Sequence, residues 1–161
     1  MDRRQHIHKT ANKVINLLWT GELPVPVRHF SDSLIINDSK NGKMDISFTT
    51  DTIDDFAVIK RCEQQKKYNI VLSSTVGNKA LLLAHCLGLI LLGYAKQELS
   101  VNSDNFDEKM HQEAYLFAVH LMIPDSSIKY RIVKTNSNAE SLASIYGVSI
   151  KKIKKRIASN G

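Results

Sequence analysis

One apolar run constrains the fold of this chain more than any other feature. Residues 80–92 read ALLLAHCLGLILL, so a helix formed by them would be apolar on every face. Counted on to residue 95, the apolar stretch is about 16 residues long, and it carries His85 near its middle. A helix that crosses a bilayer needs roughly 20 such residues. We therefore predict a helix buried at the centre of a domain, and no membrane partner.

The composition is that of one ordinary globular domain. The chain has 161 residues, of which 43% are hydrophobic and 24% charged, so it has room for one core of usual size, and we expect residues 1–161 to form a single domain. This composition excludes a disordered or collagen-like chain. Two cysteines, Cys62 and Cys86, are too few to stabilise such a domain through disulfides. The start of the chain is charged and has no apolar core, so we expect no signal peptide. We expect a cytoplasmic protein.

The order of the predicted elements indicates an α+β fold. Apolar positions at helical spacing predict a first helix over residues 4–19, which Gly21 and the LPVPV run at 23–27 end. Residues 34–36 and 44–49 read as strands that pair across Asn41-Gly42, residues 56–59 are ambiguous, and 68–72 read as another strand. We predict a small, mostly antiparallel sheet between the first helix and the central one. Helical segments then follow near 108–122, 128–133, 139–146 and 150–158.

The central helix and the helix after it resemble the ImmA/IrrE family of small zinc metallopeptidases. That family reads roughly A-H-E-L-G-H in the first helix and E-x-x-A-N-x-F-A-x-x-L-L-M-P in the second. This chain has AHCLGL at 84–89 and HQEAYLFAVHLMIP at 111–124. The LPVPV run and residues 142–149, where the family has L-A-x-x-F-x-V-S, are also similar. The resemblance implies a zincin-like minimal domain. Family members often come from phages and mobile elements and act on helix-turn-helix repressors encoded nearby.

The residues that carry the family's chemistry are largely replaced. A zinc peptidase helix needs His at i and i+4, which share one face, and Glu at i+1 to take a proton from the zinc-bound water. The chain keeps His85, but Cys86 stands at the position of the Glu and Leu89 at that of the second His. The resemblance puts His111 at the third ligand position, a Glu in the family, and Tyr115 where Asn or Asp often stands. At most two of three ligands remain, so we expect no catalytic residue and no cofactor.

Other chemistry at these positions stays open. His85 and His111, with Cys86, Glu108 or Glu113, could form a different zinc site, although adjacent residues on a helix point about 100° apart. Cys86 could act as a nucleophile beside a histidine, as in thiol hydrolases. A free cysteine in an apolar helix is more often an inert packing residue with a raised pKa. We favour a neutral His85 in the core, with apolar side chains filling the former cleft.

The net charge of +6 lies at the C-terminal end. Eight of the 22 basic residues, but one of the 16 acidic residues, lie between 126 and 161. Residues 138–158 have the pattern of a helix-turn-helix element within the domain, with Gly147 at the turn and Ser149 as the cap of the second helix. That second helix carries basic residues that we expect to be exposed and to bind a partner or DNA, namely Lys151, Lys152, Lys154, Lys155 and Arg156.

Two explanations of this basic helix stay open. Lysines neutralise DNA phosphates, but a face without Asn or Gln reads few bases, so DNA binding would be nonspecific. A solvated lysine face that keeps the protein soluble explains the charge equally well.

We predict a catalytically inactive member of the family that acts by binding. The expected partner is a helix-turn-helix repressor, another regulator from the same phage or mobile element, or a host protein. The expected docking site is the former cleft near His85, Leu89, His111 and Tyr115. One alternative is a zinc-dependent endopeptidase with a remodelled site at His85 and His111 that cleaves a repressor. A second is a DNA-binding regulator that uses the basic C-terminal helices.

Overall fold

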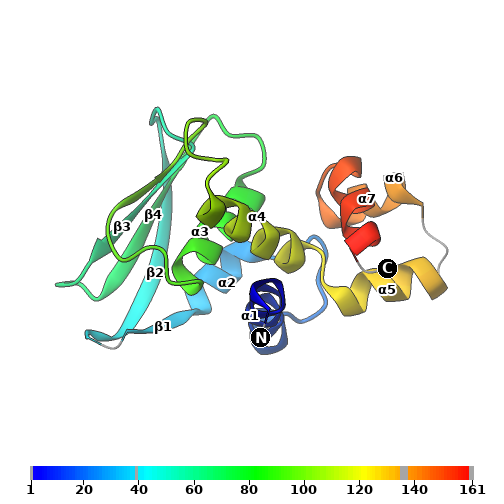
Figure 1. Cartoon of the computed structure of the whole chain (residues 1–161), viewed down its shortest axis with the longest axis horizontal. Helices are drawn as coiled ribbons and strands as arrows, with labels where there is room; N and C mark the ends of the chain where they lie inside the picture. Colours follow the sequence, from blue (N-terminus) through cyan, green and yellow to red (C-terminus); the bar gives the residue numbers. More distant parts are fainter. Residues whose placement is uncertain (1, 39, 135–137, 160–161) are drawn as a thin grey trace.

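The computed structural model describes residues 2–38, 40–134 and 138–159 and confirms the α+β fold (Figure 1). An N-terminal helix precedes a small sheet, and the central buried helix and the C-terminal helices follow. The elements are, in chain order, α1 (Arg3–Leu18), α2 (Val27–Ser33), β1 (Ile35–Asp38), β2 (Gly42–Asp51), β3 (Ala57–Cys62), β4 (Lys67–Ser73), α3 (Lys79–Leu91), β5 (Leu99–Val101), α4 (Lys109–Met122), α5 (Asp125–Lys134), α6 (Ala139–Tyr146) and α7 (Ile150–Ser159).

The five strands form one mixed sheet in the order β1-β2-β4-β3-β5. The predicted hairpin is confirmed, because β1 pairs antiparallel with β2 and Ile36 lies opposite Met44. One pair of strands differs from the antiparallel majority, because β2 and β4 run parallel with Ile46 opposite Tyr68. The reason is the β3–β4 hairpin, which folds β4 back into the position next to β2. The other three pairings are antiparallel, so the sheet is mostly antiparallel, as predicted.

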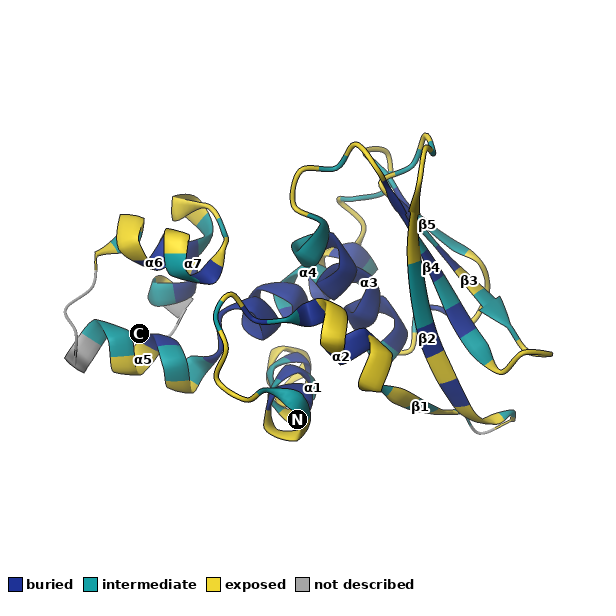
Figure 2. Ribbon diagram, turned by 180° about the vertical axis from the view of Figure 1, so that it is seen from behind, coloured by how far each residue is buried: buried dark blue, intermediate teal, exposed yellow. Residues whose placement is uncertain are grey.

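Helix α3 is the buried centre of the molecule, as its apolar sequence predicts. Every residue from Leu82 to Ile90 is buried. Figure 2 shows α3 and α4 as dark blue helices between the sheet and α1. One cluster of buried apolar side chains runs from Ile7 on α1 to Ile153 on α7. No helix in the described ranges is long and apolar enough to cross a membrane.

Two short elements are absent from the sequence prediction. Helix α2 has seven residues, directly after the proline-rich run, and buried Val27 and Phe30 hold it against the core. Strand β5 has three residues, and it pairs with β3 so that Val101 lies opposite Ala57. Both are too short to show a hydrophobic period, so only their packing makes them regular structure.

The C-terminal helices lie on the side of α4 away from the sheet (Figures 1 and 2). Helix α5 begins at Asp125, directly after Pro124, and is longer than the predicted segment 128–133. Helices α6 and α7 match their predicted ranges to within one residue.

Helices α3 and α4 approach each other closely at Gly88. A Cβ atom on Gly88 would lie 2.9 Å from Cδ1 of Phe117 and 3.1 Å from the backbone oxygen of Ala114. Real Cβ atoms essentially never come within 3.0 Å of another heavy atom, so a side chain at position 88 would push the helices apart.

We expect Gly88→Ala to lower the free energy of unfolding by about 1–2 kcal/mol. Overpacking of a core typically costs about 1–3 kcal/mol, and the better helix propensity of alanine returns at most about 1 kcal/mol. Urea unfolding measures the difference. The control is Gly77→Ala, where an added Cβ meets nothing within 4 Å. If Gly88→Ala lowered the free energy of unfolding as little as Gly77→Ala does, the result would contradict the close helix contact.

Candidate functional site

The two histidines that the family resemblance singles out face each other across the α3–α4 contact. Nε2 of His85 lies 3.2 Å from Nδ1 of His111, and the rings are nearly parallel with centroids 5.4 Å apart. One ring donates a hydrogen bond to the other. The side chains are 2% and 0% exposed, respectively. The scaffold therefore brings together residues that lie 26 positions apart in the sequence.

Apolar side chains stand where the resemblance puts the family's other chemical groups. Leu89 follows His85 by one helical turn and is fully buried, and it offers no metal-binding atom. Cys86 is also fully buried, and burial raises the pKa of its thiol to about 12. A buried thiol with a raised pKa favours packing over nucleophilic attack.

Phe106 covers the histidines from the loop between β5 and α4. Its ring stacks on His85 with centroids 5.3 Å apart and meets the ring of Tyr115 edge-on at 6.3 Å. Hydrogen bonds hold this loop in place, because Asn105 donates to the Ser100 carbonyl and its backbone N–H donates to Asn102. The place where we predicted a docking cleft is therefore covered at its centre.

Phe106 is a site residue that the sequence analysis missed. The available signal was one aromatic residue within the polar stretch 97–107, but nothing in the sequence says where such a ring will lie. Of the four positions expected to form a docking cleft, only Tyr115 is partly exposed.

Burial disfavours the charged form of both histidines. Burial, and then the neighbouring His111, lowers the pKa of His85 from its ordinary 6.5 to about 4. Burial also lowers the pKa of His111, although the Glu108 carboxylate opposes this shift. The outer nitrogens, Nδ1 of His85 and Nε2 of His111, have no hydrogen-bond partner among the described residues.

The residues present do not fit the zinc site of the family. A spacing of 3.2 Å between two nitrogens would suit two ligands on one tetrahedral ion. A catalytic zinc needs three protein ligands, however, and Leu89 stands where the resemblance puts the second His. In the ranges 2–38, 40–134 and 138–159, no three His, Cys, Asp or Glu side chains are grouped so that they could hold a metal ion.

Glu113 does not complete the histidine pair, although it lies on the same helix as His111. Its Oε1 accepts hydrogen bonds from Nε of Arg3 at 2.6 Å and from the hydroxyl of Tyr94 at 2.9 Å. The carboxylate therefore joins α4 to α1 and to the chain that follows α3.

The C-terminal basic segment forms two short helices joined by a tight turn. Gly147 ends α6 in the left-handed conformation, with φ at 66°. The hydroxyl of Ser149 accepts a hydrogen bond from the backbone N–H of Lys152 in the first turn of α7. These are the positions at which the sequence predicts the turn and the cap, while DNA binding by this segment stays a prediction.

The basic residues of α7 differ in their exposure. Lys151, Lys154 and Lys155 are exposed and Lys152 is half-buried. The predicted exposure of Arg156 is wrong, because this side chain is 2% exposed. Its guanidinium donates to the Ile123 carbonyl and forms an ion pair with Asp125. The periodicity of α7 places position 156 one turn after buried Ile153, on the face toward α4 and α5.

We expect His85→Gln to make the protein less sensitive to acid. Below pH 6.5 the unfolded state binds a proton at position 85 before the folded state does, so acid lowers the stability of the wild type until the pH nears 4. The loss from this one group is about 3 kcal/mol, and glutamine cannot titrate. Urea unfolding at neutral and acidic pH measures it. His29→Gln, at an exposed position on α2, is the control, and equal pH dependence of all three proteins would contradict a buried neutral His85.

The comparisons with known proteins place this fold and site in a family. The model of the IrrE N-terminal-like domain matches residues 41–158, which include the sheet from β2 onward and helices α3 to α7 up to residue 158. No curated protein matches the sequence.

Among solved structures, a Mycobacterium tuberculosis transcriptional regulator has a similar fold, with a TM-score of 0.61 and 13% sequence identity. The match covers 96% of this chain and 46% of that chain, so this chain spans about half the length of the regulator. The family model covers most of the chain and both helices that carry the histidine pair. The protein therefore belongs to the family of IrrE N-terminal-like domains.

Proposed function

We propose that this protein is a catalytically inactive member of its family that acts by binding another protein. One observation supports the proposal: the buried His85 and His111 lie 3.2 Å apart where the ImmA/IrrE resemblance puts zinc ligands, and Leu89 stands at the position that the resemblance gives to a further ligand. Without the third ligand and the base, the chain has no means to activate water as the family does. The scaffold around the pair is intact, which suits a protein that binds rather than cuts.

The proposed partner is a regulator of transcription. The ImmA/IrrE resemblance favours a helix-turn-helix repressor or another regulator from a phage or mobile element, or a host protein in its place. The structurally similar Mycobacterium tuberculosis protein is a transcriptional regulator, which supports a regulatory role. We propose that the partner contacts Tyr115 and the loop that carries Phe106, because these residues form the outer surface over the closed cleft.

We expect the purified wild type to bind no stoichiometric zinc. The variant that restores the family pattern, Cys86→Glu with Leu89→His and His111→Glu, should bind about one zinc per chain, because it regains three ligands on the same scaffold. Metal analysis by mass spectrometry after incubation with zinc measures both, and circular dichroism checks that the variant folds. In a parallel assay, the wild type should bind a helix-turn-helix repressor encoded beside it and leave the repressor uncut.

The alternative, a zinc endopeptidase with a remodelled site, gives opposite results in the same experiment. It requires about one zinc per wild-type chain, lost in both His85→Ala and His111→Ala, and metal-dependent cleavage of the repressor. Either result would overturn the proposal of an inactive protein.

A second candidate function is DNA binding by α6 and α7. The supporting observation is that two capped helices meet at Gly147 and that α7 points Lys151 and Lys154 away from the core. Lysines at such positions neutralise phosphates without reading the base sequence.

This candidate predicts a salt-dependent affinity for any duplex. We expect Lys151→Ala with Lys154→Ala to weaken binding and to reduce the slope of log K against log salt by about 2, because each phosphate contact contributes about 0.9. Fluorescence anisotropy with a labelled duplex measures the slope. The control is Lys43→Ala with Lys60→Ala, which removes two exposed lysines from the sheet. Equal affinity at low and high salt would exclude DNA binding by this surface.

A further inference from the structure

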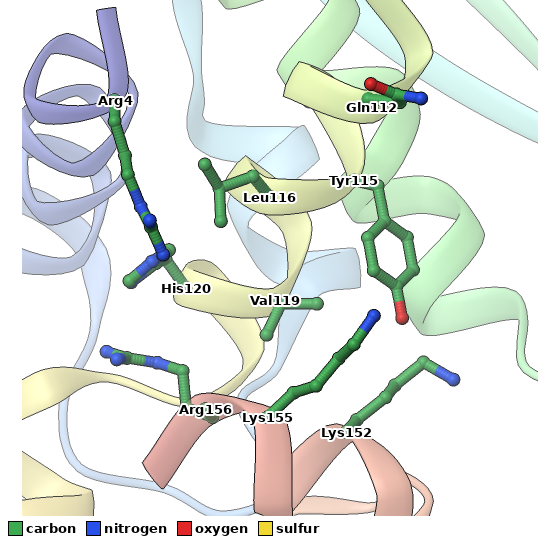
Figure 3. A pocket seen from close by; sticks show the side chains of 9 residues that line it. All are labelled: Arg4, Gln112, Tyr115, Leu116, Val119, His120, Lys152, Lys155 and Arg156. Atoms are coloured by element: carbon green, nitrogen blue, oxygen red, sulfur yellow. The ribbon is translucent and has the colours of Figure 1, made fainter. Parts of the chain in front are cut away.

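A second cluster of functional groups lines a cavity of about 360 Å³ where α1, α4 and α7 meet (Figure 3). Along α4 the cavity runs from Gln112, the residue after His111, to His120. His85 and His111 are not part of its lining, so the cavity is separate from the covered α3–α4 contact, although Tyr115 borders both the cavity and Phe106.

Positive charge surrounds this cavity. Arg4 from α1 and Lys152, Lys155 and Arg156 from α7 line it, and no acidic residue of the described ranges does. Figure 3 shows Arg4 reaching down beside His120, and Lys155 reaching toward Tyr115 on α4. Arg156 is neutralised by Asp125. Arg4, Lys152 and Lys155 have no ion pair with any residue in the described part of the chain.

His120 is a buried residue whose ring contacts that of His8, with centroids 3.7 Å apart. Its Nε2 has no hydrogen-bond partner among the described residues and is itself buried. Burial, and then Arg156 and His8, lowers the pKa of His120 to about 3, which favours the neutral ring at physiological pH. His120 therefore contributes its ring to the cavity wall, close to where a bound molecule would lie.

Apolar groups form the remaining wall. Leu116, Val119 and the ring of Tyr115 lie on the side of α4 that faces the cavity. A site with cations at its rim and an apolar wall suits a ligand that joins an anionic group to an apolar body. A phosphate monoester carries close to two negative charges at neutral pH and accepts several hydrogen bonds, which matches three cations without an ion pair in the described part of the chain better than a carboxylate does.

We propose that the cavity between α1, α4 and α7 binds a small aromatic phosphate monoester. The phosphate contacts Arg4, Lys152 and Lys155. The aromatic body packs against Leu116, Val119 and Tyr115, near the ring of His120. This inference does not depend on the state of the histidine pair between α3 and α4.

The first experiment is calorimetric titration of the full chain with phenyl phosphate. We expect a Kd of about 1 mM or tighter, inorganic phosphate roughly tenfold weaker, and no measurable binding of uncharged phenol. Lys152→Ala with Lys155→Ala should weaken phenyl phosphate binding at least about tenfold. The matched control is Lys151→Ala with Lys154→Ala, which removes the same charge from the same helix outside the cavity and should change the affinity less than about twofold.

Three results would overturn the proposal. The first is no binding by the wild type. The second is an equal loss of affinity for phenyl phosphate in the two double-lysine variants, which would indicate attraction to the basic helix as a whole. The third comes from competition with DNA. If a short DNA duplex displaces phenyl phosphate, and if both double-lysine variants lower the affinity for the duplex equally, the phosphates bound would be those of DNA.

A second measurement places the ligand. Histidine side-chain signals in ¹H–¹⁵N nuclear magnetic resonance spectra should shift for His120 when phenyl phosphate is added, and those of exposed His29 should not. An unchanged His120 signal at saturating ligand would mean that the anion binds elsewhere, whatever the calorimetry shows.

Discussion

The close contact of α3 with α4 at Gly88 is the constraint on which the rest of the structure depends. With no side chain at position 88, the two backbones come near enough for His85 on one helix to meet His111 on the other at 3.2 Å. Helix α4, held in this position by α3, in turn contacts α1 and α7. Glu113 joins it to Arg3 on α1, and its C-terminal end meets α7 through Arg156, which donates to the Ile123 carbonyl. Both candidate sites therefore depend on where α3 holds α4.

The contact between α3 and α4 combines close packing with a closed, mostly apolar surround. Gly88 packs against Ala114 and Phe117. At the positions where the ImmA/IrrE resemblance expects the groups that handle water and zinc, this chain has Cys86 and Leu89, and the ring of Phe106 lies over His85. Burial favours the neutral form of His85, because a buried imidazole without a carboxylate partner is more stable uncharged. The proposal of an inactive protein rests on this combination.

Helical periodicity divides the basic residues of α7 among three environments. Ile153 and Arg156 lie one turn apart and face the core, where Arg156 pairs with Asp125. Lys152 and Lys155 line the cavity beside α4, and Lys151 and Lys154 face outward. A run that reads as one uniform patch of charge is thus a buried ion pair, the rim of a cavity and a solvent face. This division is what allows paired lysine variants on one helix to separate binding of a small anion from binding of DNA.

The sequence by itself determined the α+β order, the buried α3, the β1–β2 hairpin and the family, because each follows from local hydrophobic period, turn residues or motif spacing. It also showed which chemical residues of the family are missing. Only the tertiary structure decided that β4 lies parallel to β2, that short α2 and β5 form, that Phe106 closes the cleft, and that Arg156 is buried. The cavity that brings Arg4 to Lys155 is likewise a tertiary feature. These depend on contacts between residues far apart in the chain, and the pattern of neighbouring residues carries no information about such contacts.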